Sequence, residues 1–179
     1  MQAMAGRLAR LVRHLWLDEA DSRRAVPPAA AQRLAEQVAA SERRHTGEIG
    51  VCVEASLPLD WLWPVPDEAA VPALVRRRAL SWFGQLGVWD TPDNNGVLVY
   101  VLLAERAIEI VADRGLARHL PPDAWAPVLD GLRAAWRAGE PEHGLAQAIE
   151  AVGQVLETHF PARTAQERPN ALPDAVWCC

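Results

Sequence analysis

Cysteine is scarce in this sequence and lysine is absent, and the shortage of cysteine excludes two classes of protein. The three cysteines are Cys52, within an apolar segment, and the adjacent Cys178 and Cys179. They form neither the spaced pairs of a disulfide scaffold nor a CxxC zinc motif. We therefore expect reducing, cytoplasmic conditions, and we interpret Cys178 and Cys179 as part of a frayed tail.

The sequence also lacks a surplus of positive charge and a long apolar run. Its 18 basic residues are all arginine, and its 23 acidic residues leave a net charge of −5. Nucleic-acid-binding domains usually carry a basic surplus, so no nucleic-acid partner is expected. No segment approaches the roughly 18 consecutive apolar residues that span a bilayer, which predicts no transmembrane segment. Arginines interrupt the N-terminal segment, so it does not fit a signal peptide either.

Residues 1–27 are expected to form an amphipathic helix followed by a linker. Apolar side chains recur at helical spacing on one stripe: Leu8, Leu11, Val12, Leu15 and Trp16. Four basic side chains fall largely off this stripe: Arg7, Arg10, Arg13 and His14. Two interpretations stay open, since the stripe could dock on the domain or could bind a membrane surface or a partner.

Residues 28–160 are predicted to form one α/β domain, and residues 161–179 a tail without a core. Alternating apolar residues predict strands over 48–55 and 107–112, and an unbroken apolar run predicts a buried strand over 97–103. Helical periodicity, with its caps and stops, predicts helices over 28–47, 67–83, 121–139 and 145–160.

The order of these elements predicts a small mixed sheet. A helix between the first two strands makes them parallel, and the tight turn at 104–106 makes the third strand antiparallel. With the turn centred there, Leu103 pairs with Ile108 and Val99 pairs with Ala112. The expected fold is a three-layer α/β/α sandwich whose sheet has two parallel strands and one antiparallel hairpin strand.

Two polar segments inside the domain have simple structural interpretations. The run Arg76, Arg77 and Arg78 lies within a predicted helix, where consecutive residues point about 100° apart, so we interpret it as a solvated face. The segment 61–63, Trp-Leu-Trp, lies in a connection, where exposed aromatic residues often mark a contact surface.

Polar residues also gather at the edge where both parallel strands begin. Seven of them are expected to meet there: Glu48, Asp90, Asp93, Asn94, Asn95, Asp113 and Arg114. The six residues other than Arg114 offer oxygen ligands on loops, which suit Ca²⁺ or Mg²⁺. The guanidinium group of Arg114 could bind a phosphate or a carboxylate through two hydrogen bonds. Each segment alone could be an ordinary turn, so the prediction depends on their convergence.

Common catalytic and cofactor motifs are missing. The sequence has no GxGxxG, Walker loop, GxSxG or HExxH pattern, so no nucleotide or organic cofactor is expected. Asp113 and Arg114 are the candidates for a catalytic role.

Motifs spread from residue 28 to residue 160 resemble a known family. They lie at residues 82–89, 94–98, 110–116, 136–139 and 143–145. Together these motifs are similar to the TPM domain family, which is named in part after a thylakoid acid phosphatase. Residues 14–19 and 170–174 resemble a bacterial branch of it.

The resemblance implies an α/β/α sandwich, divalent-ion binding in some members, an acid phosphatase activity in one member and accessory roles for membrane complexes in others. This chain departs from the common pattern at two places. Asn94 stands where many members have aspartate, and Asp113 and Arg114 stand where many have glycine and tyrosine.

Two functional hypotheses follow. The first is an accessory module that binds a structural divalent cation and a protein partner, including a membrane-associated one, and lies in the cytoplasm or peripherally at the membrane. The alternative is a metal-assisted, acid phosphatase-like hydrolase of phosphate monoesters. There Arg114 would stabilise the phosphoryl charge, and Asp93 or Asp113 would hold the metal or activate water.

Overall fold

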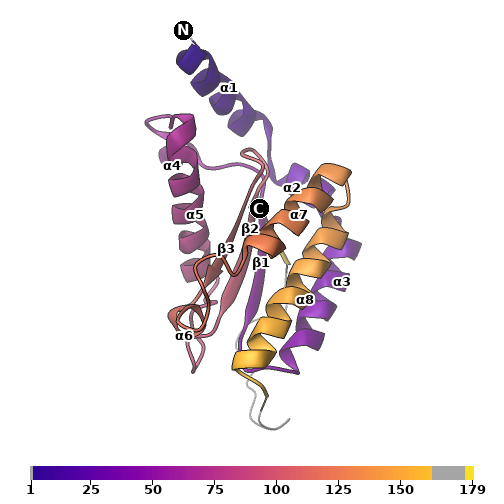
Figure 1. Cartoon of the computed structure of the whole chain (residues 1–179). Coiled ribbons are helices and arrows are strands. Elements are labelled where there is room, and N and C mark those ends of the chain that lie inside the picture. Colours follow the sequence, from indigo (N-terminus) through magenta and orange to yellow (C-terminus); the bar gives the residue numbers. More distant parts are fainter. Residues whose placement is uncertain (1, 163–175) are drawn as a thin grey trace.

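The computed structural model describes residues 2–162 and 176–179, and within them the fold has three layers (Figure 1). The middle layer is a mixed sheet with strand order β3-β2-β1-β4. The strands are β1 (Ile49–Glu54), β2 (Val97–Leu102), β3 (Ala107–Ala112) and β4 (Val176–Cys178). β1 runs parallel to β2 and β4, and β3 runs antiparallel to β2. The predicted sandwich with a mixed sheet is therefore confirmed.

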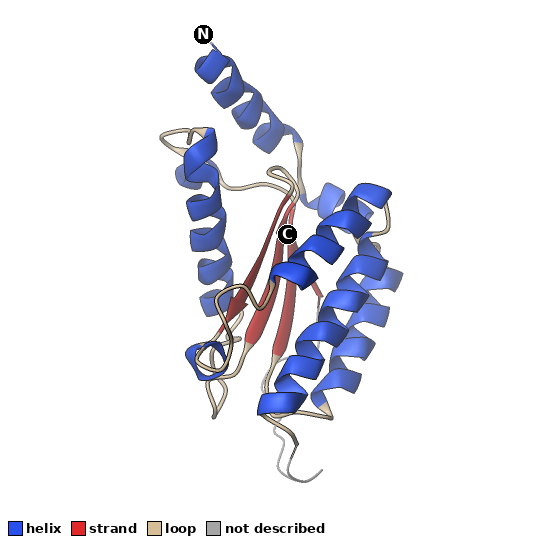
Figure 2. Cartoon of the chain, in the orientation of Figure 1, coloured by secondary structure: helices blue, strands red, loops and turns tan. Residues whose placement is uncertain are grey.

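Helices cover both faces of this sheet (Figure 2). One face carries α3 (Pro28–Glu42), α7 (Ala126–Ala138) and α8 (Pro141–His159), and the other carries α5 (Val71–Gln85). The other helical segments are α1 (Gln2–Trp16), α2 (Glu19–Ala25), α4 (Leu59–Leu62), the 3-10 turn η1 (Glu68–Ala70) and α6 (Arg114–Ala117). Within the described residues, no helix combines the length and apolar character needed to cross a bilayer.

The two central strands are buried along their whole length because helices pack on both of their faces. Val51, Val53 and Val99 point to the face under α3, α7 and α8. Cys52 and Tyr100 point to the opposite face under α5. This double covering explains the unbroken apolar run in β2.

The end of the chain corrects the prediction of a tail over residues 161–179. Residues 176–178 form β4 on the outer edge of β1, with Val51 opposite Val176 and Val53 opposite Cys178. The Cys179 N–H donates to Val53 O at 3.0 Å, and the Ala55 N–H donates to Cys179 O at 2.7 Å. The last two cysteines are thus held in the sheet, because pairing satisfies the open backbone groups of β1.

The hairpin register differs from the predicted one by two residues. Val101 pairs with Ile108, and Val99 pairs with Ile110. The turn between the strands has four residues, and its last residue, Arg106, adopts a left-handed conformation with φ of 50°. Because the shift is an even number of residues, each side chain keeps the predicted face of the sheet.

The predicted linker before residue 28 contains a further helix. Asp18 caps α2, since its side chain accepts the Ala20 N–H at 2.9 Å, while Asp21 accepts the Asp18 N–H at 3.0 Å. This reciprocal capping stabilises the first turn of a seven-residue helix that has little apolar periodicity.

Candidate functional site

The two loop segments predicted to converge do meet at the edge where β1 and β2 begin. The Asp113 N–H donates to Gly96 O at 2.8 Å, so the β2–β3 ladder continues beyond the strands. The Gly115 N–H donates to Asn94 O, also at 2.8 Å. The predicted meeting of these two loop segments is confirmed.

Glycine is required at position 115 by this close approach. A Cβ atom there would lie 2.1 Å from Asp93 O and 2.3 Å from Asn94 O, far inside van der Waals contact. Asn94 itself has a φ of 50°, a conformation that asparagine tolerates better than most residues. The sequence pattern Asn-Asn-Gly followed by Asp-Arg-Gly thus encodes a tight backbone crossing.

Side chains link the loop to the start of β1. The Thr46 hydroxyl donates to Asp93 Oδ2 at 3.2 Å and accepts from Asn95 Nδ2 at 3.0 Å. The Arg114 guanidinium donates to Asn94 Oδ1 at 3.3 Å. We call these residues, together with Asp113, the edge site. Thr46 is an addition to the predicted set, although its position before β1 already placed it at this edge.

Two buried oxygens of the edge site have no hydrogen-bond partner among the described residues. They are Asn95 Oδ1 and Asp113 Oδ2. Asn95 is fully buried, and the other oxygen of Asp113 accepts the Arg114 N–H at 2.6 Å as the cap of α6. Buried acceptors without partners are rare in folded proteins, and an ordered water or an ion usually satisfies them.

The remaining two predicted ligands lie differently. Glu48 is half-buried, and its backbone carbonyl accepts the Val97 N–H at 2.8 Å. Asp90 is exposed, and its side chain has no hydrogen bond or ion pair with any described residue. The structure therefore does not bring the carboxylate of Asp90 into contact with the edge site.

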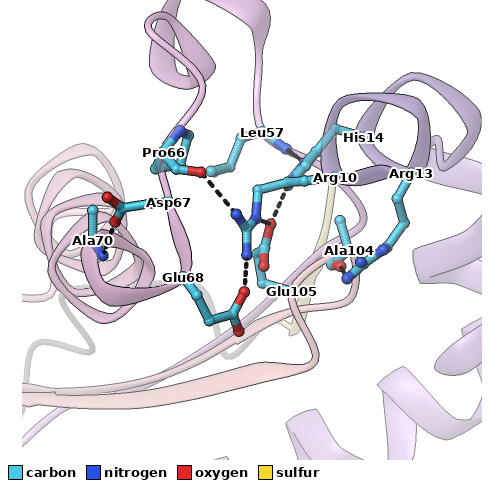
Figure 3. A network of polar contacts seen from close by, with 10 residues as sticks. All are labelled: Arg10, Arg13, His14, Leu57, Pro66, Asp67, Glu68, Ala70, Ala104 and Glu105. Atoms are coloured by element: carbon cyan, nitrogen blue, oxygen red, sulfur yellow. Dashed lines mark hydrogen bonds and ion pairs between the residues drawn. The ribbon is translucent and has the colours of Figure 1, made fainter. Parts of the chain in front are cut away.

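A second polar cluster, which the sequence did not reveal, lies at the other end of the sheet (Figure 3). Arg10 of α1 donates to Glu105 Oε1 at 2.8 Å, to Pro66 O at 2.8 Å and to Glu68 Oε2 at 2.6 Å. His14 lies 2.9 Å from the same Glu105 oxygen. We call Arg10, His14, Glu68 and Glu105 the hairpin network.

The hairpin network is tightly paired. His14 Nδ1 accepts the Leu57 N–H at 3.0 Å, so its Nε2 atom carries the proton donated to Glu105. Burial alone would raise the pKa of Glu105, but His14 and Arg10 outweigh burial and lower that pKa below its usual value. The carboxylate of Glu105 therefore stays charged in the folded protein at neutral pH.

This network turns the basic side of α1 inward, which is the reverse of the docking interpretation. Arg10 and His14 point inward and are buried, whereas four apolar side chains point outward. They are Leu8 (63% exposed), Val12 (44%), Leu15 (60%) and Trp16 (82%), which we call the outer face of α1. The interpretation that the apolar stripe docks on the domain is wrong, since only Leu11 of that stripe packs against the core. A glutamate in the hairpin turn supplies the counter-charge that draws the basic side inward.

The Trp-Leu-Trp segment is only partly the exposed surface that the sequence suggested. Trp63 is 79% exposed, but Leu62 is buried. Trp61 is half-buried beneath the guanidinium groups of Arg77 and Arg78, which lie 5.1 and 4.8 Å from its ring centroid. In this position the ring of Trp61 makes cation–π contacts with both guanidinium groups.

The arginine run corrects another expectation. Arg76 and Arg77 are exposed, but Arg78 is buried and donates to Glu54 of β1 at 3.0 Å. Tyr100 donates to the same carboxylate at 2.6 Å, and burial beside Glu54 raises the pKa of this tyrosine. Burial lowers and Glu54 raises the pKa of Arg78, and the net shift is upward. Arg78, Glu54 and Tyr100 therefore form a hydrogen-bonded cluster in the core, in which the buried arginine and the buried glutamate neutralise each other.

The architecture defines the class of protein as an α/β/α domain built on a four-stranded mixed sheet in the described residues. The family model described as the TPM domain matches residues 20–155. The chain therefore belongs to the TPM domain family. The resemblance noted at residues 170–174 lies outside the described residues.

Solved structures share the fold. The NMR structure of BA42 protein from the psychrophilic bacterium Bizionia argentinensis has a TM-score of 0.68 and 23% identity, covering 85% of this chain and 94% of that one. The N-terminal domain of a P. gingivalis protein has a TM-score of 0.52 and 21% identity, covering 74% of this chain and 77% of that one. No curated protein sequence matches this chain.

Proposed function

We propose that this TPM domain is an accessory module that binds an apolar groove of a protein partner through the outer face of α1. The observation that carries the proposal is the inverted amphipathic helix. Its basic residues Arg10 and His14 are committed to Glu105, so its apolar residues remain in solvent. An exposed apolar stripe costs solubility, and contiguous patches of this kind mark interaction sites.

The spacing of apolar residues on α1 favours a groove on a protein partner as the surface that this helix binds. Leu8, Val12, Leu15 and Trp16 stand at i, i+4, i+7 and i+8, which is the anchor pattern of helices that lie in apolar grooves. Figure 1 shows α1 projecting from the body of the domain, which gives a partner access to this side. The hairpin network fixes the orientation of the helix, so little ordering entropy remains to oppose binding.

The test compares two sets of substitutions in the full chain. A partner is captured from the host, identified, purified and titrated calorimetrically against the wild type, against the outer-face variant Leu8→Gln/Leu15→Gln/Trp16→Gln and against the control Leu80→Gln/Trp89→Gln. The control removes exposed apolar side chains from the region of α5 and its C-terminal turn.

We expect the outer-face variant to weaken binding more than about tenfold, with the control unchanged. Equal weakening by both variants would overturn the proposal. Vesicle binding or self-association that only the outer-face variant loses, without partner binding, would assign the helix to a membrane or to a second copy of the chain instead.

We further propose that the edge site binds a divalent cation. Asn95 Oδ1 and Asp113 Oδ2 are buried acceptors without partners, and hard oxygen donors suit Ca²⁺ or Mg²⁺. No group of three or more His, Cys, Asp or Glu residues in metal-binding geometry occurs in the described part of the chain. A cation at this edge would therefore use amide and backbone oxygens beside the carboxylates of Asp113 and Asp93.

Matched aspartate variants test this part. Calcium and magnesium titrations are expected to give heat with the wild type and with Asp90→Asn, and none with Asp113→Asn. Each variant removes one carboxylate charge from the same end of the sheet. Loss of binding in Asp90→Asn but not in Asp113→Asn, or a silent wild type, would contradict the site.

The phosphatase alternative stays a prediction, as does the cytoplasmic or membrane-peripheral location. In the structure Arg114 contacts Asn94, and Asp113 caps α6, so both catalytic candidates already have structural contacts. Hydrolysis of an aryl phosphate with Ca²⁺ or Mg²⁺, by the wild type but not by Asp113→Asn, would support the alternative. Equal trace rates in both would reject it.

A further inference from the structure

A pocket of about 770 Å³ lies between α2, the β2–β3 hairpin and α7, at the hairpin end of the sheet, and Leu17 after α1 also lines it. Binding pockets for small molecules usually have volumes of roughly 300–1,000 Å³. The volume is therefore in the range of a small organic ligand. The notable property of this pocket is its combination of an apolar floor with a basic rim.

The floor is formed by the sheet and one aromatic side chain. Val101 and Ile108 are buried partners across the β2–β3 ladder, and Leu103 continues this surface into the turn. Trp136 of α7 is half-buried and lines the pocket from the helical layer. Such a floor accommodates an alkyl chain or a ring, because its aliphatic side chains offer no hydrogen bonds and its one polar group is the indole N–H of Trp136.

The rim carries four arginines and one acid: Arg24, Arg106, Arg133, Arg137 and Asp21. Asp21 already accepts from Arg24 and from the Asp18 N–H, so its charge is used within α2. The chain as a whole has a net charge of −5. A local excess of cations on an acidic protein indicates an anionic ligand, because it attracts anions where the rest of the molecule repels them.

Two of these arginines have no partner in the described part of the chain. Neither Arg106 nor Arg137 makes an ion pair or a side-chain hydrogen bond there. Arg137 stands one helical turn after Arg133, whose guanidinium already pairs with Asp130. Arg106 adopts its left-handed φ of 50°, which is unfavourable for a residue other than glycine or asparagine. A bound anion would give the guanidinium groups of Arg106 and Arg137 the partner that they lack.

We propose that this pocket binds a soluble amphiphilic carboxylate of the medium-chain fatty acid class. Its carboxylate pairs with Arg106 and Arg137, since guanidinium groups match carboxylates with two parallel hydrogen bonds. Its alkyl chain lies along Val101, Leu103 and Ile108, against Trp136. The proposal does not depend on the outer face of α1 or on a cation at the edge site.

The first experiment separates the charge of the ligand from its chain. The full-length protein is titrated calorimetrically with decanoate, with acetate and with decyltrimethylammonium. We expect binding of decanoate only, because acetate lacks the chain and the ammonium compound carries the opposite charge. Equal binding of decanoate and decyltrimethylammonium would overturn the proposal, since the arginines would then play no part.

The second experiment locates the site with three variants that each remove one arginine. Arg106→Gln and Arg137→Gln are expected to weaken decanoate binding about tenfold each, the effect of losing a charge-assisted hydrogen bond. Arg43→Gln is the matched control, because Arg43 is exposed at the end of α3 and its side chain has no partner in the described residues. Thermal melting of all three variants checks that the fold is retained.

Further outcomes decide between sources of the anion. We expect decanoate to shift the indole N–H signal of Trp136 in NMR spectra of the wild type. Equal weakening by Arg43→Gln would overturn the assignment of the site. Cosedimentation with phosphatidylglycerol vesicles that Arg137→Gln abolishes, without decanoate binding, would assign these arginines to a membrane surface and also overturn the proposal.

Discussion

The two ends of the sheet differ in how completely their polar side chains are paired. At the hairpin end, Glu105 is buried and engages both Arg10 and His14, and Arg10 donates three hydrogen bonds. At the opposite end, Asn95 and Asp113 each keep a buried oxygen without a partner among the described residues.

This difference separates a structural cluster from a candidate binding site. A saturated cluster has no free coordination capacity, so its contribution is to hold α1 in place. An unsaturated cluster carries a desolvation cost that a ligand removes. Both clusters contain carboxylates near basic side chains, so residue type alone does not distinguish them. Substitutions that remove pairing at one end of the sheet and leave it unchanged at the other test this difference.

The largest expected effect comes from removing the central carboxylate of the hairpin network. Glu105→Ala leaves Arg10 without its buried counter-charge and with only the exposed Glu68 as a partner, and should reduce the free energy of unfolding by about 3 kcal/mol, because breaking a buried ion pair is costly. Urea denaturation measures this loss. The Leu57 N–H donates a hydrogen bond to His14 Nδ1, so its hydrogen exchange should accelerate as α1 detaches.

An exposed ion pair supplies the control for this prediction. Glu19 and Arg23 form a surface pair on α2, and Glu19→Ala should change stability by less than about 1 kcal/mol. If Glu105→Ala and Glu19→Ala had equal effects, the hairpin network would not be the element that holds α1.

The next effect concerns the backbone crossing at the edge site. Gly115→Ala places a methyl group against Asp93 O and Asn94 O, so the loop must move and stability should fall by about 2 kcal/mol. Calcium binding should be lost at the same time. Gly131→Ala is the matched control, because a Cβ there meets no atom within 4 Å. A folded Gly115→Ala protein that keeps wild-type stability would show that the crossing is not tight.

Sequence periodicity predicts the parts of this fold that depend on apolar burial. The bounds of β3, the parallel pairing of β1 and β2, and the meeting of residues 94–96 with 113–115 all follow from alternation and chain order. Each of these features is set by which face of a segment must leave water, and that information is local in the sequence.

The features that escaped prediction depend on partners distant in sequence. Arg10 is buried because Glu105, 95 residues away, lies beside it in the fold. Arg78 is buried because Glu54 of β1 faces α5, and β4 is too short to show alternation. An arginine on a helix has the same local signature whether it faces water or a buried carboxylate, so its burial cannot be derived from its own segment.

The pairing of Glu105 also predicts a dependence on pH. Its pKa is lowered in the folded protein, so the stabilisation that it provides is complete above the usual glutamate value near 4.5. That stabilisation is lost as the pH falls through the lower, folded value. The stability difference between the wild type and Glu105→Gln should therefore shrink in acid, as urea denaturation between neutral and acid pH would measure. A difference that stays constant down to the acid limit would contradict the ion pairing.

The smallest effect should be found at the unsaturated end. Without a cation, Asp113→Asn is expected to change stability by less than about 0.5 kcal/mol, since Asp113 Oδ2 has no partner to lose and an asparagine oxygen can still cap α6. With calcium present, the wild type and Asp90→Asn should gain stability as the site fills, whereas Asp113→Asn should gain none. Thermal melting with and without calcium measures both parts. A large loss without a cation would mean that Asp113 is as fully paired as Glu105, and the distinction between the two ends of the sheet would fail.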